Sequence, residues 1–334
     1  MADQLSLFSP DEPDRAASDA LPVGPATVAS EVLELAMQLP HHLYMGTSSW
    51  FFPGWHGLVW DRVADEATLA RTGLDAYAQH PLLNTVCMDR TFYAPLDVSQ
   101  YRAYADQVPD RFRFVVKAPG AVTQSWLRGG DGTPKGNPTF LDPVHALEHF
   151  VEPCLRGLGP KAGALLFQFP PLGRAQLRER SRFIGRLHEF LAALPEGPLY
   201  AVEMRDAAVL SRPFFAAVRE AGAHYTVAVH PRLPAVAVQA AAMAGSGPGP
   251  LVVRWNLNPR EEYAAAKARY SPFDRLVDED VSTRESIARL VAPPLAAHQP
   301  VFIIANNKAE GSAPLTLARL AGAIAATLRA ARTL

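Results

Sequence analysis

The sequence predicts an α/β protein built as a single (β/α)8 barrel, the TIM barrel, preceded by a disordered N-terminal tail. Eight short apolar runs each end in a polar residue, and most are separated by stretches in which apolar residues recur at helical spacing. Such runs are typical of strands buried on both faces, and eight of them alternating with helices predict a closed parallel barrel. The runs span residues 43–50, 85–92, 111–119, 164–171, 199–206, 224–231, 251–258 and 301–308.

The chain has 334 residues, of which 49% are hydrophobic, and a formal net charge of −1. A barrel of this type takes about 250 residues, so we expect a flexible tail over residues 1–40 and the barrel over 41–334. The overall charge gives no indication of nucleic-acid or membrane binding. The acidic start does not resemble a signal peptide, and no apolar stretch approaches the ~20 residues that span a bilayer. We therefore expect a cytoplasmic protein without a membrane partner.

The segments between the strands justify the remaining elements in order. Apolar residues recur every three or four positions in most of them, and proline or glycine ends several, as expected for helices. One connection, residues 119–143, is rich in glycine and proline and is too long for an ordinary turn, so we expect a rim loop there. Helices are predicted over 31–39 (below the barrel), 66–80, 98–108, 174–194, 211–222 (with Ser211 as N-cap), 280–292 and 314–333, with an irregular excursion over 259–273.

Polar residues at the carboxyl ends of the predicted strands form the candidate site, because barrels of this type carry their sites at that rim. Glu203 and Arg205 are two apart on one strand and share its inward face. Glu203 is a candidate general base, and Arg205 a candidate anion clamp; a buried ion pair is the alternative. Asp89 and Lys117 are further catalytic candidates. The remaining ligand-binding candidates are Arg254, Asn256, Gln168, His230, Asn306, Asn307 and Trp50.

Three of these candidates are cations on inward positions, which predicts a positive pocket. Lys117, Arg205 and Arg254 favour an anionic ligand such as a phosphate or a carboxylate. Asn306 and Asn307 precede the last helix, where barrels often bind phosphate, although asparagines also cap turns. Trp50 belongs to an aromatic cluster that either stacks a planar ring or packs a loop.

A metal site is a weaker interpretation of the same residues. Asp89, Glu203 and His230 follow different strands and carry the ligand types that suit divalent metals. The sequence contains no HExxH motif and no CxxC motif. The cofactor therefore stays open, with a divalent metal as one alternative.

Seven segments resemble the YecE-like family, also known as domain of unknown function 72. The resemblance covers almost the whole chain from residue 43 onward. It implies a TIM barrel with a site at the upper rim, but it implies no reaction, apart from a distant likeness to sugar isomerases. The matching segments are MGTSSWFFPGWHG (45–57), TFYAP (91–95), FRFVVKAP (112–119), LLFQFPP (165–171), AVEMR (201–205), VVRW (252–255) and ANNKAEGSAPLTLARL (305–320).

The chain departs from the family pattern at several rim positions. The family usually has Glu-x-Asn before Thr-Phe-Tyr, where this chain has Cys87 and Asp89. Asn256 stands in place of a usual histidine, and His230 in place of an aspartate. Asp206 and Val209 replace a further histidine and tryptophan.

A second motif lies at the start of the chain. Gln4, Leu5, Ser6, Leu7 and Phe8 resemble the pentapeptide with which many bacterial DNA polymerases and repair proteins bind the sliding clamp. Apolar side chains fill a pocket in such a motif, and the glutamine amide supplies directional hydrogen bonds. The alternative is that Leu5, Leu7 and Phe8 pack on the barrel.

Two hypotheses from different classes follow. The first is an enzyme, a hydrolase such as a phosphodiesterase or an isomerase, that acts on a phosphorylated or nucleotide-like ligand and is linked to DNA maintenance. The second is a non-catalytic adaptor that binds nucleic acid or a metabolite at the barrel and the sliding clamp through its tail. Turnover distinguishes them.

Overall fold

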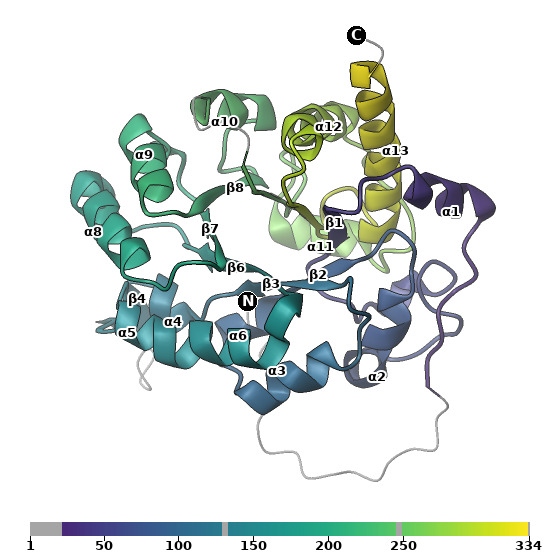
Figure 1. Ribbon diagram of the computed structural model, residues 1–334, viewed down its shortest axis with the longest axis horizontal. Coiled ribbons are helices and arrows are strands. Elements are labelled where there is room, and N and C mark those ends of the chain that lie inside the picture. Colours follow the sequence, from purple (N-terminus) through teal and green to yellow (C-terminus); the bar gives the residue numbers. More distant parts are fainter. Residues whose placement is uncertain (1–21, 129–132, 245–248, 333–334) are drawn as a thin grey trace.

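The computed structural model describes residues 22–128, 133–244 and 249–332, and its centre is a closed barrel of eight parallel strands (Figure 1). The strands follow one another around the barrel in the order β1–β10–β9–β8–β7–β6–β3–β2. β1 closes the ring by pairing with β10. The predicted fold class is thus confirmed. The strands are β1 Leu43–Thr47, β2 Thr85–Met88, β3 Arg113–Lys117, β6 Ala162–Gln168, β7 Leu199–Glu203, β8 His224–Val229, β9 Leu251–Trp255 and β10 Val301–Ala305.

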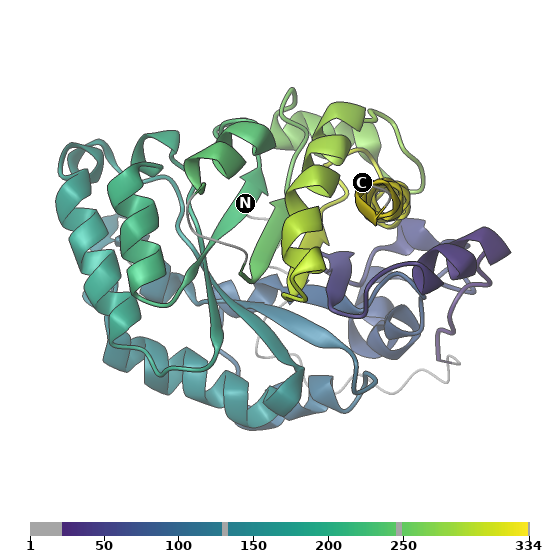
Figure 2. The same ribbon diagram turned by 45° about the horizontal axis from the view of Figure 1, so that its top comes forward.

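A helix follows each barrel strand and packs on the outside of the ring (Figures 1 and 2). Most of these helices coincide with predicted ones. Ser211 stands at the N-cap of α9, but its hydroxyl donates to the Val209 carbonyl instead of capping the helix. In the described ranges, no helix has the length and apolar character required to cross a membrane. The outer helices are α2 Glu66–Ala78, α3 Val98–Ala105, α6 Glu152–Leu158, α8 Arg180–Ala192, α9 Arg212–Glu220, α10 Val236–Ala242, α12 Val281–Ala296 and α13 Ala313–Arg332.

Additional elements lie in the connections. The predicted rim loop over 119–143 contains a short helix and an antiparallel hairpin, which the sequence did not indicate. The tyrosine-bearing excursion after β9 contains α11, which lies inside the ring of outer helices (Figure 1). These elements are α4 Gly120–Thr123, β4 Trp126–Arg128, β5 Pro134–Gly136, α5 Pro143–Ala146, α7 Arg174–Arg178 and α11 Tyr263–Tyr270, with short helical turns over 53–55, 89–92, 147–151, 159–161 and 207–209.

The described part of the predicted tail, residues 22–40, packs on the barrel. The Ala26 amide donates to the Val59 carbonyl, and Val23 is buried. The predicted helix exists as α1, Ser30–Met37, but it lies at the outer edge of the molecule beside α13 (Figures 1 and 2) and not across the bottom of the barrel. The candidate clamp-binding peptide, residues 4–8, lies outside the described residues.

Alternation along the strands separates an inner from an outer layer of side chains. Ala201 points into the barrel, whereas Val202 and Met204 pack toward the helices, as predicted. The rings of Tyr44 and Phe302 stack with their centroids 4.7 Å apart, near the amino ends of their strands. The same alternation places the inward polar residues at the opposite, carboxyl end. The buried inner cluster consists of Cys87, Val115, Ala164, Leu166, Ala201, Val252, Phe302 and Ile304.

Candidate functional site

The centre of the rim is a carboxylate held between two guanidinium groups. Glu203 ends β7, points into the barrel and is fully buried. Its Oε1 lies 2.6 Å from Nη2 of Arg205, and its Oε2 accepts a hydrogen bond of 3.0 Å from Nη1 of Arg254. Both oxygens of this candidate base are therefore engaged in ion pairs.

The second guanidinium extends the network to Asp89. Nη2 of Arg254 donates to both Asp89 oxygens, at 3.2 and 3.3 Å. The Cys87 thiol donates to Oδ1 of the same carboxylate at 3.3 Å. Asp89 opens the 3-10 turn after β2, and 29% of its side chain is exposed, whereas that of Glu203 is fully enclosed. Asp89 is the carboxylate of this network that faces the mouth of the barrel.

The electrostatic balance keeps the pair of Glu203 and Arg254 ionised. Burial raises the pKa of Glu203, but the charges of Arg205 and Arg254 outweigh burial and hold the pKa below its usual value. Burial likewise lowers the pKa of Arg254, and the Glu203 and Asp89 charges reverse this effect and raise it. A carboxylate with a lowered pKa is a weak base, which argues against Glu203 as a proton acceptor.

Lys117 ends β3 and points into the same end of the barrel. Its Nζ lies 4.0 Å from the centroid of the Phe92 ring. In the part of the chain that the structure describes, no carboxylate forms an ion pair with it. Burial lowers its pKa, and the nearby charge of Asp89 offsets only part of this effect.

A second lysine, Lys308, follows the end of β10 in the sequence. Only 6% of it is exposed, and its Nζ lies 3.5 Å from Oδ1 of Asn306 and 4.4 Å from the Tyr263 ring centroid. The Asn306 amide donates to the Ser48 hydroxyl at 2.8 Å, which fixes the orientation of the asparagine. Burial and the charge of Lys267 lower the Lys308 pKa to about 8.

The other inward candidates surround this network. The Asn256 amide donates to Glu203 at 3.4 Å. His230 is half-buried, and burial together with the Arg205 charge lowers its pKa to about 4, so the imidazole is neutral at pH 7. Gln168 ends β6, next to Glu203 in the strand register. The structure therefore brings all three to the rim.

Two candidates, Asn307 and Trp50, are occupied by contacts within the protein. Oδ1 of Asn307 accepts hydrogen bonds from the Trp55 indole (3.1 Å) and from the Ala313 amide (2.9 Å) at the start of α13. This is the turn-capping alternative considered for the asparagine. Trp50 is 3% exposed and packs edge-on against Phe51 and Tyr104. It packs a loop and presents no free ring face at the mouth.

The candidate metal ligands do not assemble into a cluster. Within the described residues, no group of three His, Cys, Asp or Glu side chains is arranged to hold a metal ion. Asp89 and Glu203 both contact Arg254, and Nδ1 of His230 accepts from the Arg232 amide. The donor set therefore does not fit the metal interpretation.

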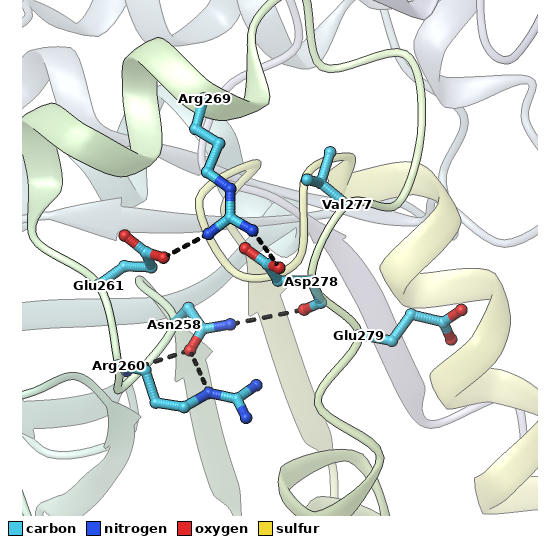
Figure 3. Close-up of a pocket in the computed structure, with 7 residues that line it drawn as sticks. All are labelled: Asn258, Arg260, Glu261, Arg269, Val277, Asp278 and Glu279. Carbon is cyan, nitrogen blue, oxygen red and sulfur yellow. Dashed lines mark hydrogen bonds and ion pairs between the residues drawn. The ribbon is translucent and has the colours of Figure 1, made fainter.

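A separate hollow of about 410 Å³ lies beside the loop after β9 (Figure 3). Three of its charged groups are paired with one another, because Arg269 bridges Glu261 and Asp278, both at 2.8 Å. The Asn258 side chain accepts from Arg260 at the edge of this hollow (Figure 3). We therefore place the candidate site at the barrel mouth.

Lys308 was not among the site residues predicted from the sequence, although its position gave a hint of function. Lysine is scarce in this chain, at five residues, and two of the five, Lys117 and Lys308, fall at the ends of predicted strands. That signal was present, but periodicity alone did not give Lys308 an inward direction. Tyr93 lies in the TFYAP segment and Tyr263 in the predicted excursion over 259–273, but neither was predicted as a site residue.

The fold agrees with comparisons to known proteins. A family model described as protein of unknown function DUF72 matches residues 44–333. A DUF72 family protein from Thermotoga maritima is similar over 83% of this chain and 97% of its own length, with 18% identity and a TM-score of 0.55. One from Enterococcus faecalis is similar over 86% and 95%, with 16% identity and a TM-score of 0.54. Identities this low show a shared fold alone.

No curated protein matches the chain. The match to the family model nevertheless extends from β1 to the end of α13 and includes every barrel strand. This protein belongs to the DUF72 family.

Proposed function

We propose that the protein binds a phosphorylated ligand at the carboxyl-end rim of its barrel, with Lys117 and Lys308 as the principal anion-binding side chains. One observation carries this proposal: neither lysine is paired with a carboxylate of the described chain, although both are largely buried at the same mouth. Buried charges are normally paired. A bound anion would supply the missing partner.

The charge balance of the rim supports an anionic ligand. Two carboxylates, Asp89 and Glu203, face four cations, so the site has two positive charges in excess. Arg205 and Arg254 are neutralised by the carboxylates. Arg205 also has a buried Nη1 for which the described residues offer no acceptor. This N–H group is a third donor for an oxyanion.

The same arrangement supports a reaction as well as binding. Asp89 is partly exposed at the mouth and lies within electrostatic reach of Lys117, so it is our candidate general base. Glu203 positions the two arginines, and Lys117 would stabilise charge that develops on a phosphate oxygen. The proposed reaction class is hydrolysis of a phosphoester, with isomerisation of a phosphorylated sugar as the alternative.

The second candidate function is that of an adaptor. The peptide over residues 4–8 favours it, because a sliding-clamp ligand at the start of the chain would bring the barrel to DNA. In that function the rim would bind a nucleic acid or a metabolite without converting it. Linkage to DNA maintenance follows from the peptide in either case.

Titration calorimetry with inorganic phosphate tests the binding site. Lys117→Met and Lys308→Met should each weaken binding about 10-fold or more, because one charge-assisted contact contributes about 1.5–3 kcal/mol. Lys135→Met, on the exposed hairpin strand β5, is the matched control and should bind as the wild type does. Unchanged affinity in a folded double variant would rule the site out.

Turnover assays separate the enzyme from the adaptor. A phosphomonoester, a phosphodiester and a sugar phosphate are each incubated with the wild type and with Asp89→Asn. Conversion that Asp89→Asn abolishes supports the enzyme. Phosphate binding without conversion of any of the three supports the adaptor.

A further inference from the structure

Two exposed tyrosines border the mouth that contains the lysines. Tyr93 follows the turn that carries Asp89, and Tyr263 is the first residue of α11. The two residues are 42% and 54% exposed. Few large apolar side chains of the described chain are this exposed, and no structural role in the core requires either ring.

The two rings lie near the same carboxylate although they are far apart in sequence. Burial raises the pKa of Tyr93, and the charge of Asp89 adds to this effect. Burial also raises the pKa of Tyr263, to which the charges of both Tyr93 and Asp89 contribute. Tyr93 and Tyr263 therefore lie within electrostatic reach of Asp89.

Each tyrosine also lies near one of the two lysines that have no carboxylate partner among the described residues. Nζ of Lys308 lies 4.4 Å from the ring centroid of Tyr263. Nζ of Lys117 lies 4.0 Å from Phe92, whose ring packs edge-on against Tyr93 with centroids 5.3 Å apart. An exposed tyrosine is thus placed near each lysine, in direct contact with Lys308 and through Phe92 for Lys117.

We infer that the ligand is a nucleotide, whose phosphate contacts Lys117 and Lys308 and whose base stacks on Tyr93 or Tyr263. This inference rests on the proposed phosphate site and names the rest of the ligand. A sugar phosphate alone would leave both tyrosine rings without a stacking partner. A nucleotide base would supply one, because every base has a π-face that stacks on tyrosine. Trp50, the stacking candidate indicated by the sequence, cannot serve this purpose, because it is buried.

Calorimetry with the full chain tests the inference by comparing adenosine 5′-monophosphate with ribose 5-phosphate. The nucleotide should bind about 10-fold tighter or more, since stacking on one aromatic side chain contributes on this scale. Tyr93→Leu combined with Tyr263→Leu should remove the difference between the two compounds, while ribose 5-phosphate still binds. Trp126→Leu, on the separate β4–β5 hairpin, is the matched control and should retain the difference.

Equal affinities of the folded wild type for the two compounds would overturn the nucleotide inference and leave the phosphate site intact. Failure of both compounds and of inorganic phosphate to bind would overturn the proposed function as well. A further arm separates two sources of the nucleotide. If a 5′-phosphorylated thymidylate strand binds tighter than thymidine 5′-monophosphate, the ligand is the end of single-stranded DNA. If the two bind equally, the ligand is the free nucleotide.

Discussion

Arg254 and Glu203 form an ion pair of 3.0 Å inside the barrel, although β8 separates their strands, β9 and β7. The reason is geometric: side chains in one layer of a barrel come from alternate strands. Lys117, on β3, is two strands beyond β7 and belongs to the same alternate set. Charged groups from distant parts of the chain thus meet at one level of the barrel.

Glu203→Gln should destabilise the protein by about 3–5 kcal/mol, because it leaves two largely buried guanidinium groups without their shared carboxylate. Urea unfolding measures this loss. Glu152→Gln, in an exposed pair with Arg156, is the control and should change the free energy of unfolding by less than about 0.5 kcal/mol. A loss below about 1 kcal/mol for Glu203→Gln would show that the network tolerates the missing charge.

The stabilisation due to Glu203 should depend on pH. Its folded pKa is lowered, so the unfolded chain binds this proton more tightly than the folded one. The contribution is fully present above the unfolded value, about 4.3, and is lost as the pH falls through the folded pKa. The difference in unfolding free energy between the wild type and Glu203→Gln should therefore shrink toward pH 3. A constant difference between about pH 6 and pH 3 contradicts this assignment.

Binding of sulfate should weaken above about pH 8, because the Lys308 pKa is lowered to about 8 and the amine loses its charge there. Sulfate keeps its charge over this range, so the pH profile reports the protein. Calorimetry from pH 6 to pH 10 should show this decrease in the wild type. Lys308→Met should bind more weakly at pH 7 and lack the decrease. The same profile in the variant would assign the titration to another group.

The N-terminal peptide should bind a bacterial sliding clamp with a micromolar Kd, near −8 kcal/mol. Leu7 and Phe8 contribute about 1.5–3 kcal/mol each when fully covered, so replacing both with alanine should abolish binding. The melting temperature should not change. Asp11→Ala, outside the pentapeptide, is the control and should bind as the wild type does.

The absence of any heat of binding at high micromolar concentrations would show that the pentapeptide is accidental. Earlier melting of the double variant would show that Leu7 and Phe8 pack on the barrel.

Two glycine substitutions should have opposite effects on stability. A Cβ at Gly46 would lie 1.7 Å from the Thr85 carbonyl of the neighbouring strand, so Gly46→Ala should cost more than about 2 kcal/mol. Gly185 lies in α8 with open space around it, so Gly185→Ala should stabilise the protein by about 0.5–1 kcal/mol. Thermal unfolding compares them. Equal changes in melting temperature for the two variants would mean that the contact between Gly46 and the Thr85 carbonyl relaxes to admit the Cβ.

Part of the site could be predicted because strand alternation is a local property of the backbone. Once a strand was recognised, its period of two gave Lys117, Glu203 and Arg254 one direction, and the carboxyl-end rule gave them one rim. Residues beyond the strands had no such guide. Asn306 and Asn307 are adjacent, yet one faces Lys308 and the other caps α13.

The sequence by itself determined the barrel, its eight strands and the rim at which the polar residues gather, because these depend on periodicity and on the positions of proline and glycine. Only the tertiary structure decided how the charges are used. Arg254 is neutralised by Glu203 and Asp89, whereas Lys117 and Lys308 have aromatic rings as neighbours. Ion pairing depends on distances of a few ångströms between strands that are far apart in the chain, and local patterns do not contain those distances.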